Sequence, residues 1–584
     1  MTIGTPRPMT STQSSRPKTF SVAIIGSGGS GVVTAGQILL KAVAKAGFYG
    51  LMSRSSGPQI RGGESAAMIR IGLEPVTCLD DRFEILLAFD WLNSDRFKDE
   101  IPLSKDSIII RDPDAGDVPQ VLLDSGARVI EAPLSTLAKQ VDQGRGNMVG
   151  LGFLSELLGI PQVAILGAVA STLKRKGTAV TQAAQACVTL GYTGEKPPTG
   201  FQRLPEIENS NPRWNISGNE ASGLGAIRGG VRFVAAYPIT PASEILEWLA
   251  PNLEKIGGSL LQAEDELASI NMIIGGSFGG VPSLTATSGP GLSLMMEGLG
   301  LAVTSETPVV VCNVMRGGPS TGIPTKSEQS DLNIALYGFH GDAPHLVLAA
   351  LDIQDCCFTT QWAVQLSEEM QTVAIVLSDQ SQGQARAIID PPAEAQASGI
   401  RSTAPAGTDG YLRYTLNESG VSPMAVPGTA GCIYTADGLE HNQKGTPSSM
   451  ATDHLNQLDK RLRKIVHYNY GSDWAITRGE GENIILTWGS SSGAAFEAAE
   501  RLTQQGHATR AIAIRLLAPL QRESLAALLA NGKRMIVVEQ NHGAQFFQYL
   551  HAQQALPGYA RSLARPGPLP IRPNDIVTFM MEEF

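Results

Sequence analysis

A short apolar segment that runs directly into a glycine-rich turn constrains the fold of this chain more than any other feature. Residues Phe20–Ile25 have the pattern of a buried strand, the turn covers Gly26–Gly31, and an apolar helical pattern covers Val32–Ala46. A strand, a glycine turn and a helix in this order open a βαβ unit of the Rossmann type. The sequence therefore predicts an α/β protein that begins with a Rossmann-like domain.

The glycines of this turn match the G-x-G-x-x-G pattern of dinucleotide-binding proteins. They are Gly26, Gly28, Gly29 and Gly31. A dinucleotide site also uses an acid about 20 residues later to bind a ribose hydroxyl, and no Asp or Glu lies between residues 32 and 63. Arg54 would suit a 2′-phosphate, so an NADP-dependent dehydrogenase is one alternative. We favour a different role over dinucleotide binding. Either the glycines let the helix pack closely on its strand, with an anion bound at the helix N-terminus, or the turn binds a ligand other than a nicotinamide dinucleotide.

Length and composition restrict the class of protein. A chain of 584 residues is expected to hold about three or four domains. The net charge of −10 argues against a general nucleic-acid binder. No apolar run approaches the roughly 18 residues that a membrane span needs, so we expect a soluble, cytoplasmic protein. The six cysteines form no CxxC pair and the eight histidines no HExxH motif, so the sequence suggests no metal or cluster site.

Composition and periodicity divide the chain into six segments. In chain order we expect a disordered tail (1–19), a Rossmann-like domain (20–195), a Pro/Asn-rich linker (196–219), a second α/β domain (220–392), an irregular connecting region (393–479) and a third α/β domain (480–584). The connecting region contains a charged helix at Leu455–Ile465. Its basic residues are expected on a solvated helix face, or else against an acidic partner: Lys460, Arg461, Arg463 and Lys464.

The second α/β domain has three strand ends with loops suited to ligand binding. The apolar strand Val231–Ala236 ends in Tyr237-Pro-Ile-Thr-Pro241, whose prolines predict a rigid turn with a non-helical Thr240. Strands at 281–287 and 309–314 end in Ser288-Gly-Pro-Gly291 and in the Gly/Ser/Thr/Pro-rich loop Arg316–Thr325. The carboxyl ends of parallel strands meet at one edge, so these loops predict a binding crevice.

These motifs together resemble the 2-oxoacid:ferredoxin oxidoreductases, which use thiamine diphosphate. The Tyr-Pro-Ile-Thr-Pro turn is a mark of their alpha subunit, and the acids Glu264-Asp-Glu266 precede a helix in a family pattern. Residues 20–195, with the glycine turn and the segment Arg61-Gly-Gly, are similar to the gamma domain of the same family. Residues 480–584, including Glu539-Gln-Asn541, are similar to its transketolase-C-terminal-like domain. The resemblance implies a fused gamma–alpha subunit whose middle domain is of the pyrimidine type.

The resemblance also implies roles for individual residues. A carboxyl group that bonds to the aminopyrimidine ring of thiamine diphosphate promotes deprotonation of its thiazolium carbon, and such a group is expected to be buried. Glu266 is the candidate and Glu264 the alternative, whereas Asp265 is expected only to favour the helix N-terminus. We expect the oxoacid to contact Tyr237, Thr240, Arg316 and Thr325. The cofactor is expected to contact Ser288, Gly289 and Pro290, and the gamma-domain loop comprises Gly26, Gly28, Gly29, Gly31 and Arg61.

Two features that the family chemistry needs are missing from this chain. It has no Gly-Asp-Gly motif for the diphosphate and Mg²⁺, and no cluster cysteines to accept electrons. The resemblance therefore implies a beta subunit that carries Mg²⁺ and a [4Fe-4S] cluster, shares the thiamine diphosphate and forms a heterotetramer with this chain. The expected reaction is CoA-dependent oxidative decarboxylation of a 2-oxoacid, with electrons passed to ferredoxin, and the reverse carboxylation is also open. We favour 2-oxoglutarate over a pyruvate-specific or broad enzyme.

The sequence also bears on two other functions, a serine hydrolase and a non-enzymatic subunit. Gly275-Gly-Ser-Phe-Gly279 fits the G-x-S-x-G pattern of serine hydrolases. It follows a predicted helix rather than a strand, and no HGGG-type segment is present, so a hydrolase is not expected. The non-enzymatic rival is a scaffold subunit that keeps the fold without the chemistry.

Overall fold

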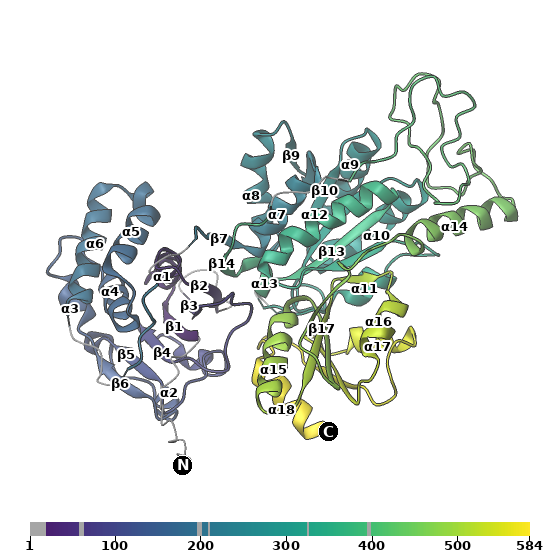
Figure 1. The fold of residues 1–584 in the computed structure, drawn as a ribbon. Coiled ribbons are helices and arrows are strands. Elements are labelled where there is room, and N and C mark those ends of the chain that lie inside the picture. The colour runs from purple at the N-terminus through teal and green to yellow at the C-terminus, as the bar shows by residue number, and fades with distance from the viewer. Residues whose placement is uncertain (1–18, 58–62, 195–200, 208–210, 324–325, 394–398) are drawn as a thin grey trace, which may run out of the picture. The chain divides into compact units, whose positions relative to one another are not determined.

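The computed structural model describes residues 19–57, 63–194, 201–207, 211–323, 326–393 and 399–584 (Figure 1). The chain divides into two compact units. The first comprises Met1–Gly50, Ala66–Pro75 and Arg82–Asn211, and the second comprises Leu51–Ser65, Val76–Asp81 and Pro212–Phe584. The boundary passes through β2 (Tyr49–Ser56) and β3 (Glu64–Gly72). No helix of the described residues is long and apolar enough to cross a membrane.

The first unit is a parallel α/β layer that begins with the predicted strand, turn and helix. Its strands follow the order β6-β5-β4-β1-β3, and those other than β3 are β1 (Thr19–Ser27), β4 (Ile85–Ala88), β5 (Ile108–Arg111) and β6 (Arg128–Glu131). The strands β1, β4, β5 and β6 pair in parallel. The helices of this unit are α1 (Val32–Lys45), α2 (Gln120–Leu123), α3 (Leu134–Ala138), α4 (Gly146–Leu158), α5 (Gln162–Leu173) and α6 (Thr178–Tyr192).

Two glycines allow α4 and α6 to approach each other closely. A Cβ atom on Gly152 would lie 2.0 Å from the carbonyl oxygen of Val188, and one on Gly191 would lie 2.0 Å from that of Val149. No side chain fits at either position, so the two helix backbones touch where these glycines face each other.

The middle of the second unit is a seven-stranded sheet in the order β18-β12-β13-β11-β10-β8-β9. Its strands are β8 (Phe233–Ala236), β9 (Ser259–Gln262), β10 (Ser283–Thr287), β11 (Val309–Met315), β12 (Leu346–Ala349), β13 (Val373–Asp379) and β18 (Leu516–Ala518). All pair in parallel except β18, which is antiparallel to β12. Parallel strands covered on both faces are expected to be continuously apolar, which explains the run in β11.

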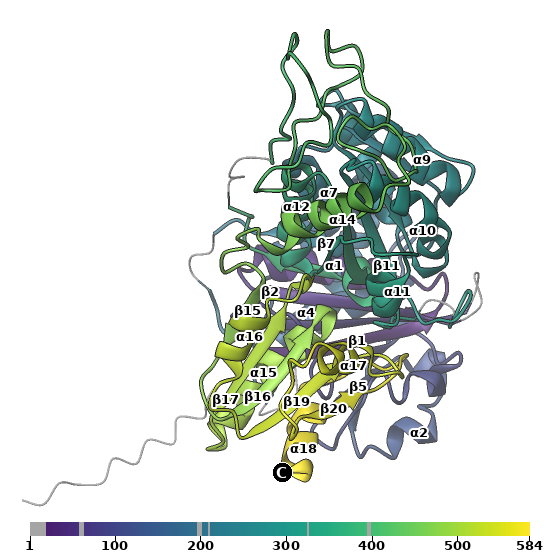
Figure 2. The ribbon, with the colours of Figure 1, turned by 90° about the vertical axis from the view of Figure 1, so that its right-hand side faces the viewer.

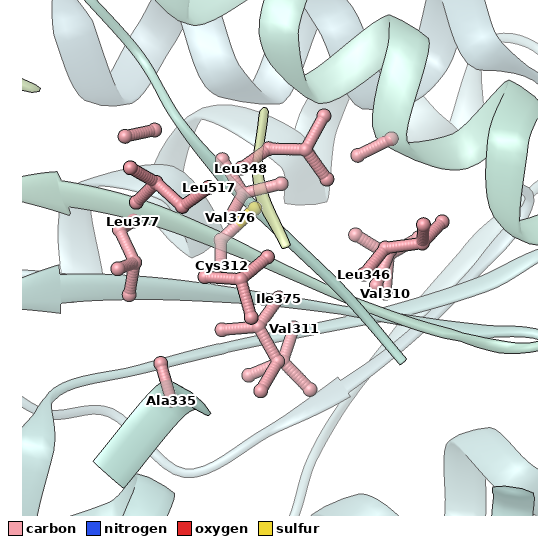
Figure 3. Packing of buried hydrophobic residues seen from close by; sticks show 14 of the residues in the cluster. Val310, Val311, Cys312, Ala335, Leu346, Leu348, Ile375, Val376, Leu377 and Leu517 are labelled. Atoms are coloured by element: carbon pink, nitrogen blue, oxygen red, sulfur yellow. The ribbon is translucent and has the colours of Figure 1, made fainter. Parts of the chain in front are cut away.

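Helices cover both faces of this sheet. Figure 2 shows α7 (Gly218–Gly229) and α12 (Ile353–Met370) on one side, and α9 (Glu266–Phe278) and α10 (Gly289–Thr304) on the other. The helix α8 (Ser243–Glu254) packs beside α7. Between the layers lies a core to which both the strands and the covering helices contribute side chains, and Figure 3 shows its part around β11, β12 and β13. This core fixes the strand ends that carry the candidate site.

The C-terminal part is a second sheet, ordered β15-β17-β16-β19-β20. Its strands are β15 (Ala475–Arg478), β16 (Asn483–Trp488), β17 (Thr509–Ile514), β19 (Arg534–Glu539) and β20 (Arg561–Ala564), of which only β15 is antiparallel. Its helices are α15 (Ser492–Gln504), α16 (Arg522–Leu529), α17 (Gln545–Ala552) and α18 (Pro573–Glu583). Side chains alternate between its faces, since Ile485 packs with α15 and α18 while Leu486 packs with α16 and α17. The predicted strands 483–488 and 534–539 are confirmed.

The segment predicted as a linker ends in regular structure. The strand β7 (Trp214–Ser217) pairs antiparallel with β14 (Arg386–Ile389), and α7 begins at Gly218. Ser217 caps α7 through a capping box with Glu220.

The expectation of a solvated basic helix in the connecting region is wrong. Within α14 (Ala451–Val466), the side chains of Lys460, Arg461 and Lys464 are buried. The ammonium groups of Lys460 and Lys464 lie 2.5 and 2.8 Å from the carboxylate of Glu306, and Arg461 pairs with Glu440. Apolar side chains of this helix are exposed instead of these basic ones, among them Leu455, Leu462 and Val466. Charge alone did not predict exposure, because the buried acid comes from a segment 154 residues away.

Candidate functional site

The turn after β8 and the loop after β11 meet through one hydrogen bond. Arg316 Nη1 donates to the carbonyl oxygen of Thr240 at 2.8 Å. The Thr240–Pro241 peptide bond is cis, and Asn219 Nδ2 donates to the carbonyl oxygen of Pro241 at 2.9 Å. Tyr237, at the start of the turn, is exposed. The structure thus brings Thr240 and Arg316 together, as the strand-end pattern predicted.

The three adjacent acids differ in their environment. Glu264 and Asp265 are exposed, and Asp265 Oδ1 accepts a hydrogen bond from the backbone N–H of Ala268 at 2.7 Å. Asp265 is therefore the N-cap of α9, which confirms the interpretation that it serves the helix start. Glu266, at the first position of the helix, is only 7% exposed. Of the three acids, Glu266 alone meets the requirement of burial.

Glu266 lies against the first turn of α10. A Cβ atom on Gly291 would lie 2.6 Å from Glu266 Oε1 and 2.1 Å from Thr287 Oγ1. Only glycine leaves room for this carboxyl group, so Gly291 places α10 beside the start of α9. The turn contains Ser288, Gly289 and Pro290 as well, with Ser288 at the N-cap position.

A second carboxyl group, partly exposed, approaches the same turn, and no sequence motif predicted it. Asp331 precedes α11 (Leu332–Tyr337), and its Oδ2 accepts a hydrogen bond from Asn313 Nδ2 at 2.9 Å. A Cβ atom on Gly289 would lie 2.6 Å from Asp331 Oδ1. Burial raises the pKa of Asp331 to about 6, although the bond from Asn313 and the charge of Arg316 partly oppose the shift.

Among the buried polar atoms at this edge that have no partner within the described residues, two come from adjacent strand ends. They are Ser288 Oγ and Asn313 Oδ1. Asn313 pairs in register with Thr287, so both atoms come from adjacent strand ends. Buried polar atoms normally have hydrogen-bond partners, so this pair fits a polar ligand at the edge. The signal in the sequence was an asparagine inside the apolar strand 309–315.

Two predicted site residues, Arg61 and Thr325, lie outside the described residues. The glycine turn of the first unit lies within the described residues, and the carboxylate of Asp90 accepts hydrogen bonds from its residue Ser27. Ser27 N and Ser27 Oγ both donate to Asp90 Oδ2 at 2.8 Å. Gly29 and Gly31 have φ angles of 104° and 91°, and a Cβ atom on Gly31 would lie 2.1 Å from Asn147 Nδ2.

Two rival functions lose support. Arg54, the residue suited to a 2′-phosphate, forms an ion pair with Glu244. Ser277 of the G-x-S-x-G segment lies within α9 and is fully buried. Its hydroxyl donates to the carbonyl oxygen of Pro308 and accepts from Arg401 Nη2 at 3.0 Å, so it is a structural residue. A serine hydrolase is not supported.

Three family descriptions match successive parts of the chain. Residues 21–194 match the pyruvate ferredoxin/flavodoxin oxidoreductase family, and residues 224–460 match the thiamine diphosphate-binding domain of pyruvate flavodoxin/ferredoxin oxidoreductases. Residues 472–566 match the transketolase C-terminal domain. The order of these matches is the order that the sequence predicted for the multi-domain α/β chain.

Whole-chain relatives agree with these matches. The alpha subunit of the 2-oxoacid:ferredoxin oxidoreductase of Saccharolobus solfataricus is 31% identical over 90% of this chain and 92% of its own length. The 2-oxoglutarate synthase subunit KorA of Archaeoglobus fulgidus is 37% identical over 56% of this chain and 88% of its own length. A solved 2-oxoglutarate:ferredoxin oxidoreductase from Magnetococcus marinus, with 2-oxoglutarate, coenzyme A and succinyl-CoA bound, has 35% identity and a TM-score of 0.90. It covers 97% of this chain and 100% of the solved chain.

Proposed function

Because this chain belongs to the 2-oxoacid:ferredoxin oxidoreductase family, as a fused gamma–alpha subunit, we propose that it oxidises 2-oxoglutarate to succinyl-CoA. The reaction is a CoA-dependent oxidative decarboxylation, ferredoxin accepts the electrons, and the reverse carboxylation is accessible. The observation that carries the proposal is the buried Glu266 at the same sheet edge as the Arg316–Thr240 pair. The 2-oxoglutarate ligand of the Magnetococcus marinus enzyme supports the choice of substrate.

Thiamine diphosphate fits the residues at this edge. A buried carboxyl group is what the aminopyrimidine ring needs, and Glu266 is buried against the first turn of α10. In the proposal Glu266 binds the ring, and Ser288, Gly289 and Pro290 line the cofactor. When bound, the cofactor supplies the electron sink for loss of carbon dioxide. The unpaired Ser288 Oγ is a polar atom that such a ligand can satisfy.

The substrate carboxylate is assigned to Arg316. Its Nη1 is bonded to Thr240, while its Nε is buried and has no partner within the described residues. A guanidinium group held by a backbone carbonyl has a fixed orientation, so it can grip a carboxylate with charge-assisted bonds. Tyr237 and Thr240 complete the proposed contacts from the described residues, and Thr325 is proposed from the sequence alone.

We further propose that the active site is completed by a beta subunit. That subunit would supply the part of the site that binds the diphosphate and Mg²⁺, and it would carry the [4Fe-4S] cluster. The assembly would be a cytoplasmic heterotetramer. Exposed apolar side chains on α9 and α10, the two helices that meet at Glu266 and Gly291, support an interface there: Leu267 is 51% exposed and Leu294 is 49% exposed. The domain limits proposed with this function are 20–195 for the gamma domain, 220–392 for the pyrimidine-type domain and 480–584 for the C-terminal domain.

The test is a panel of 2-oxoacids on the complex purified after co-expression with a beta subunit. The proposal expects thiamine diphosphate in the purified complex and CoA-dependent ferredoxin reduction that is fastest with 2-oxoglutarate. A preference for pyruvate would overturn the choice of substrate. A complex without thiamine diphosphate and without activity on any 2-oxoacid would support the scaffold alternative. NADPH binding by the chain alone would instead support the dehydrogenase alternative.

A further inference from the structure

The C-terminal sheet holds a side chain from the middle domain at its carboxyl edge. That side chain is Gln329, which is 0% exposed. Its Nε2 donates to the carbonyl oxygen of Trp488 at 2.9 Å, and its Oε1 accepts from Ser491 Oγ at 3.0 Å and from the backbone N–H of Gln540 at 2.7 Å. Trp488 ends β16 and Gln540 follows β19, so the amide lies between two adjacent strand ends.

The backbone of Gln329 is bound by the same loops. Its N–H donates to the carbonyl oxygen of Gln540 at 2.8 Å, and its carbonyl oxygen accepts from Asn541 Nδ2 at 3.2 Å. Gly489 has a φ angle of 61°, and a Cβ atom there would lie 2.4 Å from Gln329 Nε2. Open α/β sheets usually bind ligands at this edge. Here the edge binds a residue of the same chain through five hydrogen bonds.

The residues around Gln329 are held by the C-terminal part as well. Glu328 Oε1 accepts from the backbone N–H of Gly567 at 3.0 Å. Gln545 Nε2 donates to the carbonyl oxygen of Ser330 at 2.8 Å, and Gln545 Oε1 accepts from the N–H of Asn333 at 2.9 Å. The segment 328–333 is therefore anchored at four positions.

The anchored segment also contacts the residue that the proposed function assigns to the substrate. Ser330 Oγ donates to the carbonyl oxygen of Arg316 at 3.4 Å, and the N–H of Gly317 donates to the carbonyl oxygen of Lys326 at 3.0 Å. Asp331, two residues after Gln329, bonds to Asn313 of β11. A shift of Gln329 would thus be passed to Arg316 through neighbouring backbone.

We propose that Gln329 is a positioning residue for Arg316. The C-terminal domain contributes to substrate binding because it binds Gln329 and so fixes the loop that carries Arg316. This inference rests on the proposed role of Arg316 in binding the oxoacid carboxylate. Loss of the Gln329 amide frees the loop and removes the amide partner of three buried groups: the Trp488 carbonyl, the Ser491 hydroxyl and the Gln540 N–H. The carboxylate interaction is then weakened before the chemical step, which raises KM more than it lowers kcat.

The test compares Gln329→Ala, Gln329→Glu and the milder Ser491→Ala in the complex with the beta subunit. Gln329→Glu keeps the shape but places an oxygen against the Trp488 carbonyl. We expect KM for 2-oxoglutarate to rise about tenfold in both Gln329 variants and about twofold to threefold in Ser491→Ala, with KM for CoA unchanged. Thr487→Val is the matched control, because it removes a buried hydrogen bond of the same sheet, to Val538, without touching the segment. Its KM is expected to equal that of the wild type.

A second readout separates this inference from the proposed function. Hydrogen–deuterium exchange of the purified chain should be faster within residues 317–333 in Gln329→Ala than in the wild type or Thr487→Val. Unchanged exchange there, or unchanged KM in a folded Gln329→Ala enzyme, overturns the inference. A kcat and KM change shared by Thr487→Val overturns it too. Failure of the wild-type complex to oxidise any 2-oxoacid refutes the proposed function, while the exchange comparison still decides whether Gln329 holds the loop.

Discussion

Glu266 and Asp331 both lie against the first turn of α10, Glu266 at Gly291 and Asp331 at Gly289. The Glu266 side chain is buried and that of Asp331 is partly exposed, and their hydrogen-bond partners also differ. Asp331 is bonded to Asn313 and its pKa is raised to about 6 by burial. Two acids from different segments therefore lie at one helix N-terminus, where a nearby anion is favoured.

The substitution Glu266→Gln is expected to abolish most of the activity of the complex. The amide keeps the shape of the side chain but cannot exchange a proton with the cofactor ring, a role worth about 10²–10⁴ in rate. The measurement is ferredoxin reduction with 2-oxoglutarate, alongside the thiamine diphosphate content of the complex. Glu264→Gln is the control, because Glu264 is exposed, and its rate should match the wild type. Full activity in Glu266→Gln would show that another residue has this role.

Asp331→Asn is expected to change the pH dependence of stability. The folded pKa of about 6 lies above the ordinary value of 3.8, so the native state binds more protons between those limits. The contribution of Asp331 to stability is therefore greatest at low pH and falls as the pH rises through 6. The wild type therefore loses about 3 kcal/mol of unfolding free energy as the pH rises, which corresponds to two pKa units. The asparagine variant does not titrate at this position and lacks this loss.

The measurement for Asp331→Asn is the unfolding midpoint in denaturant at pH 4.5 and at pH 7.5. The difference in unfolding midpoint, variant minus wild type, should increase from pH 4.5 to pH 7.5. Glu264→Gln, which changes an exposed acid, should show no such gain. A difference between Asp331→Asn and wild type that stays constant with pH would contradict the raised pKa.

The sequence predicted the strand ends of the site but not the contacts that complete it. Thr240 and Arg316 were predictable because each follows an apolar strand and parallel strands end at one edge. Glu266 was predicted from the family pattern of acids that precede a helix. Asp331 and Gln329 were not, because their partners lie 18 and up to 212 residues away. Nothing in the local sequence separates Asp331 from an ordinary residue before a helix.

The basic residues of α14 are buried although the sequence predicted a solvated face, and the physical reason is related. A run of Lys and Arg normally faces solvent, because burying an unpaired charge is costly. Lys460 and Lys464 are buried because Glu306 is buried with them. That acid stands between α10 and β11, so its burial depends on tertiary packing that no local sequence pattern predicts.

The substitution Arg316→Lys is expected to weaken binding of the oxoacid. Lysine keeps the charge but lacks the several donors of the guanidinium group. In Arg316, Nη1 donates to the Thr240 carbonyl while Nε remains available for the carboxylate. A charge-assisted hydrogen bond is worth about 1.5–3 kcal/mol, so KM should rise about 10- to 100-fold. Steady-state kinetics with 2-oxoglutarate measures this. Arg54→Lys, which alters a partly exposed ion pair with Glu244, is the control and should leave KM unchanged. Equal KM in both variants would remove Arg316 from the site.

The substitution Glu306→Gln is expected to destabilise the second unit by about 3–5 kcal/mol, because it leaves two buried ammonium groups without their anion. Burial alone would raise the pKa of Glu306, but Lys460 and Lys464 lower it below the ordinary value, so the native carboxylate is charged. Thermal unfolding measures the loss. Glu440→Gln, which breaks the less buried pair with Arg461, should cost about 1 kcal/mol. Equal losses would show that the burial of Glu306 adds nothing.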